Sequence, residues 1–397
     1  MRLLLTAALL AFALDAQAQK GQDGEPKRPP MFAGADTNDA RGYYELGLQQ
    51  LAKDPATAAR SFYWASRLDP LSADALYARR IALLLSDKQR LMRYWRADRN
   101  TMRRADIRAI DSLYLRSLML NPFFYEKLER VLQTAVIEEI VRQETSGGRG
   151  SPAEMEYYIE QYLARAGSGE RAFRAYTDGR FRDALSAYAT AIKEARVKHY
   201  YRNMRGRLFF QMGEVDSALT ELSLAVEEVR KRDAKDLVYV YESKALFEHS
   251  LGLAYERLGN ATAAREAYGR ALQEDLAYAP AHLRLGYMAI EQKDTTTAVS
   301  EFDLAVQLQP GDAGMRYLYG HLLSEFGKTD EAEVQLKKAV ELNPWYALPY
   351  FTLGQLYYRT NRAQESVHAY RSFVGLSSRL DSRLSEAKQR IASLSAQ

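Results

Sequence analysis

Small and large apolar residues recur along this chain at a fixed interval of 34 residues. A glycine opens each interval, a small residue follows twelve positions later, and a large apolar residue follows four positions after that. The three sets are Gly252, Gly286, Gly320 and Gly354; Ala264, Ala298, Ala332 and Ser366; and Tyr268, Phe302, Leu336 and Tyr370. The pattern predicts one pair of amphipathic helices in each interval.

The recurring glycine needs a physical reason, because a glycine within a helix costs about 1 kcal/mol relative to alanine. We expect close approach: without a Cβ, the first helix of a unit can lie directly against the second. We expect the large apolar residue to fill the space that the next unit leaves. A single pair cannot bury its apolar face, so neighbouring pairs must stack.

The rest of the chain carries the same pattern with departures. Residues 40–145 predict helices of this kind, beginning with a unit around Gly47 and interrupted by a basic insertion at 86–108. A Gly-rich linker is expected at 146–152, followed by the main array at 153–375. The interval from Gly206 to Gly252 is 46 residues, which indicates a lengthened unit. Residues 376–397 predict a capping helix and tail, with one polar face and one apolar face formed by Leu376, Leu380, Leu384, Ile391 and Leu394.

The order Leu-Gly-x-x-Tyr, Ala, aromatic, Ala and Pro at this interval resembles the tetratricopeptide repeat family. The resemblance implies an all-α fold, a right-handed superhelical solenoid of antiparallel helix pairs with a C-terminal capping helix. It also implies a protein-interaction scaffold whose first helices line a concave groove.

In that family, residues three before and one after the glycine position face the groove, and one further turn extends the surface. The predicted partner-binding residues are therefore Asn203, Arg207, His249, Tyr287, Tyr317, His321, Phe351, Gln355 and Tyr358. Only Asn203 and Arg207 match the groups that grip a C-terminal carboxylate in the best-known peptide-binding members. The mainly aromatic set favours an extended peptide or an amphipathic helix. The alternative is that some of these rings pack between units.

The N-terminal residues predict export. Residues 1–18 contain an apolar run from Leu3 to Leu14 and end in Ala16-Gln17-Ala18, which is typical of a cleaved signal peptide. A buried first helix is the alternative. Residues 19–39 are rich in Gly, Pro and charge, and we expect a disordered leader. No run is long enough to predict a transmembrane helix, so we expect a bacterial protein that is periplasmic or secreted.

Composition narrows the chemistry. The chain has no cysteine, which excludes disulfides and thiolate metal ligands. Its net charge of +4 is small for this length and does not indicate a nucleic-acid partner. Its five histidines do not pair with a second ligand type at a recognised spacing, and no phosphate-binding loop is found. We therefore expect no enzyme activity, metal or cofactor, and packing rather than ligation for His282.

The basic insertion supports an alternative function. Its arginines surround Tyr94 and Trp95, and such a patch suits an anionic polymer or membrane surface, with peripheral membrane contact. The candidate residues are Arg93, Arg96, Arg99, Arg103 and Arg104. The other interpretation is a solvated helical extension with internal ion pairs.

Overall fold

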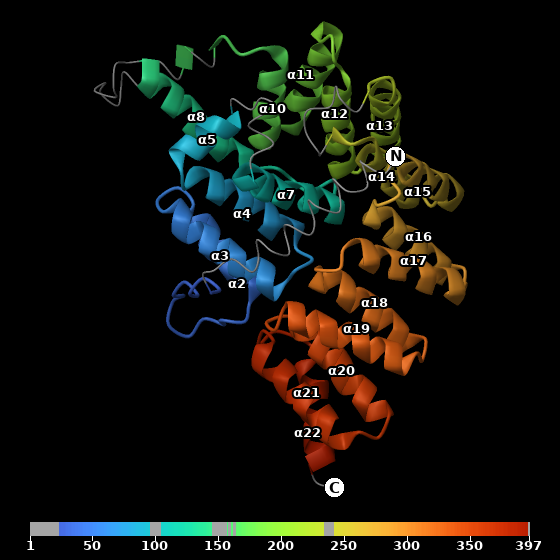
Figure 1. The fold of residues 1–397 in the computed structure, drawn as a ribbon. Helices are drawn as coiled ribbons and strands as arrows, with labels where there is room; N and C mark the ends of the chain where they lie inside the picture. Colours follow the sequence, from blue (N-terminus) through green and yellow to red (C-terminus); the bar gives the residue numbers. More distant parts are fainter. Residues whose placement is uncertain are drawn as a thin grey trace. The chain divides into compact units, whose positions relative to one another are not determined.

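A computed structural model describes residues 24–95, 105–144, 157, 160–161, 164–233 and 242–395, which form helices and no strand (Figure 1). The helices are α2 (Ala40–Gln50), α3 (Pro55–Leu68), α4 (Ala73–Leu85), α5 (Lys88–Trp95), α7 (Ala105–Leu120), α8 (Glu129–Glu144), α10 (Ser168–Thr177), α11 (Phe181–Glu194), α12 (His199–Gln211), α13 (Val215–Arg230), α14 (Lys244–Arg257), α15 (Ala261–Glu274), α16 (Ala279–Glu291), α17 (Thr295–Leu308), α18 (Ala313–Glu325), α19 (Thr329–Leu342), α20 (Ala347–Arg359), α21 (Ala363–Leu376) and α22 (Leu384–Ser395).

The chain divides into two compact units. The terminal unit comprises residues 1–50, 60–75 and 277–397, and the central unit comprises 51–59 and 76–276. Consecutive helices pack as pairs, α10 with α11, α12 with α13 and α14 with α15 in the central unit, and α16 with α17, α18 with α19 and α20 with α21 in the terminal unit. This confirms the predicted all-α solenoid of helix pairs.

The repeated glycines lie where two helices approach most closely. A Cβ added at Gly252 would lie 2.4 Å from the ring of Tyr268, and one added at Gly286 would lie 2.7 Å from the ring of Phe302. The large apolar residue therefore covers the glycine of its own helix pair. It also reaches the next helix pair, because the rings of Phe302 and Tyr319 stack with centroids 6.4 Å apart. We expected the contact with the next pair but not the cover over the glycine.

A second position recurs in the turn between paired helices, where the backbone is left-handed. Gly259 has φ 73° and Gly327 has φ 72°, while Lys293 and Asn361 adopt φ 60° and 58° at the equivalent positions. Such a backbone suits glycine, and asparagine tolerates it better than lysine. The turn can therefore be built without glycine, at a cost in backbone strain.

The predicted leader is wrong for residues 24–39, which have defined contacts in the terminal unit. The indole of Trp64 donates a hydrogen bond to the carbonyl of Pro26 at 2.8 Å, and the Asn38 amide donates to the carbonyl of Gly375 at 2.8 Å. Composition predicted disorder because this segment has few apolar residues. Hydrogen bonds and ring contacts to distant residues hold it instead.

The capping segment 376–397 also differs from the prediction. Leu376 ends α21, and α22 begins only at Leu384. Leu380, expected on the apolar face of the cap, is 88% exposed because it lies in the turn between the two helices. The cap packs on α21, with Ala387 fully buried.

Several predicted segments lie outside the described residues. They are the signal peptide at 1–18, the first part of the leader, the linker at 146–152 and most of the lengthened unit's insertion. The second helix of that unit, α13, has 16 residues, whereas α15 and α17 have 14 each. Within the described ranges, no helix is long and apolar enough to span a bilayer.

Gly252→Ala tests the close approach, with Gly269→Ala in the paired helix as the control. A methyl group at Gly252 would meet the Tyr268 ring, whereas nothing lies within 4 Å of a Cβ at Gly269. We expect Gly252→Ala to lower the free energy of unfolding by about 1–3 kcal/mol through overpacking. Gly269→Ala should raise it by up to about 1 kcal/mol through helix propensity. Urea denaturation measures both, and destabilisation of similar size by the two variants would contradict the packing.

Glu333 provides a pH test of the contacts between neighbouring helix pairs of the terminal unit. Arg362 donates a hydrogen bond to it at 2.5 Å and Tyr357 donates another at 3.0 Å, and these bonds, with that from Lys337, lower the pKa of Glu333 from 4.5 to about 2. The stabilisation from the ionised carboxylate is therefore present above pH 4.5 and is lost as the pH falls towards 2.

We expect Glu333→Gln to remove this part of the acid dependence between pH 4.5 and about 2, measured as the urea midpoint against pH. Glu341 serves as the matched control, because it is 63% exposed and pairs with Lys338 in a surface contact. Glu341→Gln should leave the pH profile almost unchanged. Equal effects of the two variants would contradict the assignment.

Candidate functional site

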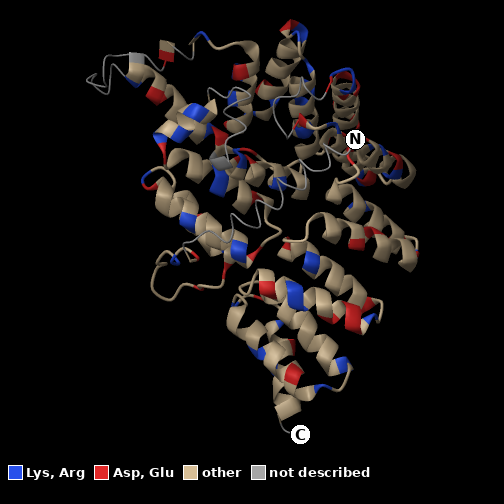
Figure 2. Ribbon diagram, in the orientation of Figure 1, with Lys and Arg blue, Asp and Glu red and all other residues tan. Residues whose placement is uncertain are grey.

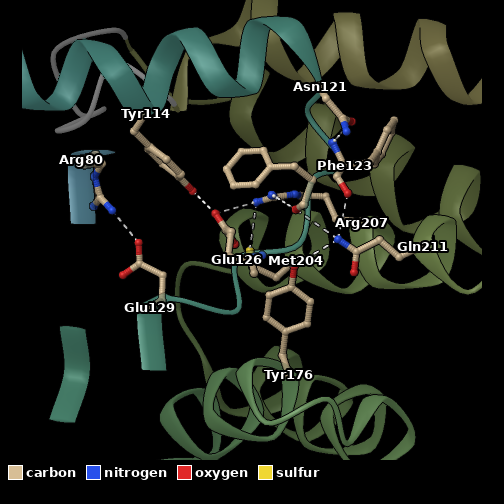
Figure 3. A network of polar contacts seen from close by, with 11 residues as sticks. Arg80, Tyr114, Asn121, Phe123, Glu126, Glu129, Tyr176, Met204, Arg207 and Gln211 are labelled. Carbon is tan, nitrogen blue, oxygen red and sulfur yellow. Dashed lines mark hydrogen bonds and ion pairs between the residues drawn. The ribbon is translucent and has the colours of Figure 1, made fainter. Parts of the chain in front are cut away.

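Residues 121–126 of the central unit lie against α10 and α12, on the surface predicted to bind a partner (Figure 3). They connect α7 to α8 without forming a helix. Phe123 stacks on Phe210 of α12 with ring centroids 3.7 Å apart and an interplanar angle of 12°. A non-helical segment of the chain itself therefore occupies the face where we expected an external peptide.

The backbone of this segment is held as a bound peptide would be. The amide of Gln211 donates hydrogen bonds to the carbonyls of Phe123 at 2.9 Å and Phe124 at 3.2 Å. On the other side, the hydroxyl of Tyr176 accepts a bond from the backbone N–H of Glu126 at 3.3 Å. Paired carbonyls make the burial of an irregular segment possible, because unpaired backbone groups in the interior are costly.

Arg207, predicted to line the partner-binding groove, holds an internal carboxylate. Its guanidinium is 3.3 Å from the carboxylate of Glu126, and both side chains are almost completely buried. Arg207 also donates to the carbonyl of Phe124 at 3.3 Å. Burial lowers the pKa of a guanidinium, but Glu126, Tyr114 and Tyr176 together outweigh it, and the pKa of Arg207 lies above its usual range. Arg207 is therefore not available to an external ligand.

The ion pair belongs to a larger buried polar network. Tyr114 donates a hydrogen bond to Glu126, and Arg80 pairs with Glu129 at 2.5 Å. Arg80 also donates to the hydroxyl of Tyr94 at 2.8 Å. Burial raises the pKa of Glu129 despite its arginine partner. Sequence reasoning missed this network, since its members are spread from α4 to α12 and share no spacing.

The remaining predicted residues of the central unit are also largely covered. His249 is 2% exposed, and its ring lies 5.7 Å from that of Tyr268. Asn203 is half-buried and borders a small cavity that Arg207 also lines. The open part of this face is a depression lined by apolar residues, among them Phe123, Phe210 and Leu253, and by Asn121, Glu256 and Arg257. The predicted residues Arg207 and His249 are not exposed on this face.

The predicted residues of the terminal unit are more accessible. His321 is exposed, and Tyr287 and Tyr317 are half-buried with part of each ring in solvent. The rings of Tyr317 and His321 stack with centroids 5.9 Å apart and an interplanar angle of 13°. Tyr317 also packs edge-on against Tyr346 at 5.2 Å. The structure thus brings together an aromatic and imidazole surface on α16 and α18, which we call the α18 face (Tyr287 of α16, Tyr317 and His321 of α18).

Phe351 is wrong as a groove residue. It is 7% exposed and packs against Tyr370 and Phe373, with ring centroids 5.8 and 4.9 Å away. The capping helix explains the difference, because Leu384, Ala387 and Ile391 of α22 belong to the same apolar cluster as Phe351. A ring at this position of a final unit is covered by the cap.

The other two predicted residues on α20 also meet the capping helix. The amide of Gln355 donates a hydrogen bond to Glu386 at 3.4 Å, and Arg390 lies 4.1 Å from the ring of Tyr358. Tyr358 keeps 37% of its surface exposed. At this end of the array, the cap therefore takes part of the surface assigned to a partner.

The described part of the basic insertion is anchored rather than free. Tyr94 is buried and donates a hydrogen bond to Asp111 at 3.0 Å, and Lys88 lies 3.9 Å from Glu139. Arg93 is half-buried, and Arg90 donates to the carbonyl of Leu83 at 3.1 Å. Figure 2 shows acidic and basic residues interspersed along the helices of both units. The other candidates, Arg96, Arg99, Arg103 and Arg104, lie outside the described residues, so the anionic-surface function stays a prediction.

His282 has a specific partner in the terminal unit. Its Nδ1 lies 2.7 Å from a carboxylate oxygen of Glu301, and the ring is largely buried. This agrees with the packing role expected for the residue. Among the residues that the structure describes, no group of histidine and acidic side chains is arranged to hold a metal ion.

The sequence matches family models over much of the regular part. Residues 170–233 and 249–313 match one model described as a tetratricopeptide repeat, and 313–344 match another with the same description. Over these residues the chain is built of tetratricopeptide repeats. No curated protein matches its sequence. Members of this family are generally non-catalytic and act in protein–protein interaction, so the protein is an interaction scaffold.

Solved structures with a similar fold are distant in sequence. YrrB, described as a TPR protein with an unusual peptide-binding site, is 19% identical, with a TM-score of 0.40 over 52% of this chain and 100% of its own. The C-terminal part of a TPR repeat-containing protein from Cytophaga hutchinsonii is 13% identical, with a TM-score of 0.43 over 52% and 77%. MamA from Desulfovibrio magneticus RS-1 is 17% identical, with a TM-score of 0.38 over 45% and 94%.

Arg207→Met tests whether the buried ion pair of Arg207 with Glu126 stabilises the central unit. The change leaves Glu126 buried without its cation, and we expect a loss of about 3–5 kcal/mol in unfolding free energy. Arg180→Ala is the control in the same unit, because Arg180 pairs with Asp183 on the surface and its side chain is 54% exposed. It should change the urea midpoint little. Similar midpoints for the Arg207 variant and the wild type would contradict a structural role for the pair.

Proposed function

We propose that this protein is a non-catalytic adaptor that binds a peptide or helix of a partner protein along the first helices of the terminal unit. The observation that supports this is the α18 face, where Tyr317 and His321 stack and His321 is exposed. A surface of rings with polar tips provides apolar contact together with hydrogen bonding, which suits an extended peptide or an amphipathic helix.

The contrast between the two units supports the choice of this face. In the central unit, residues 121–126 lie on the equivalent surface, and Arg207 and His249 are 3% and 2% exposed. A partner would have to displace a buried ion pair to bind there. In the terminal unit, Tyr287 and His321 need no such displacement.

The same comparison argues against a clamp for a C-terminal carboxylate. Arg207 was the one cation predicted at a groove position, and its guanidinium already pairs with Glu126. On the α18 face, the guanidinium of Arg284 lies over the ring of Tyr287, 5.5 Å from its centroid. We expect an internal segment of the partner, recognised mainly by ring contacts, rather than a free chain end.

The proposed partner belongs to the bacterial envelope or to secretion machinery. This part of the proposal rests on residues 1–18, whose basic start, apolar run and small-x-small end indicate a signal peptide. Export would place the mature protein in the periplasm or outside the cell. It would there meet envelope proteins as its most abundant partners.

Site-specific crosslinking in the native cell tests the proposal. We would place the photoreactive residue benzoylphenylalanine at position 321 and, as the control, at position 334. Val334 is 63% exposed but lies on α19, the second helix of its pair. We expect an adduct of defined mass from position 321 and none from 334, identified by mass spectrometry.

The adduct should weaken when Tyr317→Ala is added, since that change removes the ring stacked on His321. Helix content measured by circular dichroism would establish that this variant still folds. Adducts of equal yield from positions 321 and 334, or an adduct insensitive to Tyr317→Ala in a folded protein, would contradict the proposed binding face.

A further inference from the structure

Arg28 of the leader is enclosed by two tryptophans that are far apart in the sequence. Its guanidinium lies 4.5 Å from the ring of Trp64 on α3 and 4.4 Å from the ring of Trp345 in the turn before α20. Contact of one cation with two indole faces is a recognition geometry, because tryptophan is the aromatic ring that attracts a cation most strongly. The arrangement resembles a bound ligand more than ordinary surface packing.

Glu25 provides the second contact point of this segment. The indole N–H of Trp345 donates to its carboxylate at 2.6 Å, and Arg67 forms an ion pair with the same group. The indole N–H of Trp64 donates to the backbone carbonyl of Pro26 at 2.8 Å. Both tryptophans therefore use a ring face for Arg28 and a ring N–H for the residues just before it. The site therefore contacts an acidic residue and the arginine three positions after it.

The walls of this site are joined to each other without the leader. The rings of Trp64 and Trp345 pack edge-on at 5.3 Å. The Asn343 amide donates to the carbonyl of Arg67 at 2.6 Å, and Arg67 donates to the carbonyl of Leu342 at 3.3 Å. These contacts link α3 to the turn after α19 directly. The site is therefore built by the folded terminal unit, and the leader occupies it.

A separate contact holds the end of the leader near α2. The backbone N–H of Arg379 donates to the carboxylate of Asp36 at 2.6 Å, and its guanidinium donates to the carbonyl of Gly34 at 3.3 Å. Arg28 also donates to the carbonyl of Thr37 at 2.7 Å and to the side chain of Asn38 at 3.4 Å, and release of residues 25–28 breaks these two bonds. Residues 34–38 keep their bonds to Arg379. Release of the first part of the leader does not require the terminal unit to come apart.

We propose that Trp64, Arg67 and Trp345 form a peptide-recognition site for an acidic residue followed three positions later by arginine. In the free protein the leader itself, Glu25 to Arg28, is the ligand. When this part of the leader is released, the site accepts a peptide of the same chemistry supplied by another molecule. The site is separate from the α18 face, and it uses charge and indole rings where that face uses tyrosine and histidine.

Tryptophan fluorescence of the full chain tests the site. The chain has three tryptophans, so Trp95→Phe leaves only Trp64 and Trp345 as reporters. In this background Glu25→Ala with Arg28→Ala should release the leader and change the emission. Lys27→Ala is the matched control, because Lys27 lies between the two anchors and is exposed. It should leave the emission unchanged.

A synthetic peptide of residues 24–33 is then the probe. We expect it to restore the original emission of the released variant in a saturable way. A peptide carrying Arg28→Ala should bind with roughly tenfold lower affinity, which is the change expected for loss of a desolvated cation–π contact. The Lys27→Ala protein, whose own leader occupies the site, should respond only at much higher peptide concentration.

Circular dichroism and the urea midpoint show whether each variant is still folded. If the double variant loses helix content, the single variant Arg28→Ala takes its place in the same titration. A folded, released variant that does not bind the peptide would overturn the proposal, and so would equal binding of the peptides with and without arginine. Crosslinking at position 321 is read independently, so failure of one proposal does not imply failure of the other.

Discussion

The close approach of a glycine to the side chain sixteen positions later is the contact on which the other features of the repeat depend. A Cβ at Gly252, Gly286 or Gly354 would lie within 3 Å of an aromatic ring of the same unit. Because the ring lies directly over the first helix, both helices of a pair can share one thin layer of alanine and glycine. The same ring also contacts the next helix pair, where Phe302 stacks on Tyr319. A larger residue at the glycine position would move the two helices apart and with them the face that the first helices present.

The same face has a different role in the two units. In the central unit it binds residues 121–126, through the ion pair of Arg207 with Glu126 and the bonds from Gln211 to backbone carbonyls. In the terminal unit the α18 face is open, and we propose that a partner binds there. A repeat array with part of its groove filled by its own chain has a smaller binding surface but a more rigid one. The buried network that fills the groove also connects helices α4 to α8 with the regular repeats.

The leader shows the same principle at a second place. Residues 24–39 have too few apolar side chains to form a core, yet Arg28 and Glu25 find partners on α3 and before α20. In both places an irregular segment is held by an arginine, a carboxylate and aromatic rings rather than by burial of aliphatic surface. Such contacts are directional, so they select one segment and one register. They are also the contacts that a competing peptide of the same chemistry could reproduce.

The regular part of this protein was predictable from its sequence, because each repeat is a local structure. The interval of 34 residues, the glycines and the apolar spacing determine the helix pairs, and they identified Tyr317 and His321 on the accessible face. The sequence did not reveal the ligand of Arg207, the burial of Phe351 or the order in the leader. Each of these depends on residues more than 20 positions apart in the chain, such as Glu126 with Arg207 or Arg28 with Trp345. Only the tertiary structure brings such pairs together, because a charge or an aromatic ring carries no sequence signal that names its distant partner.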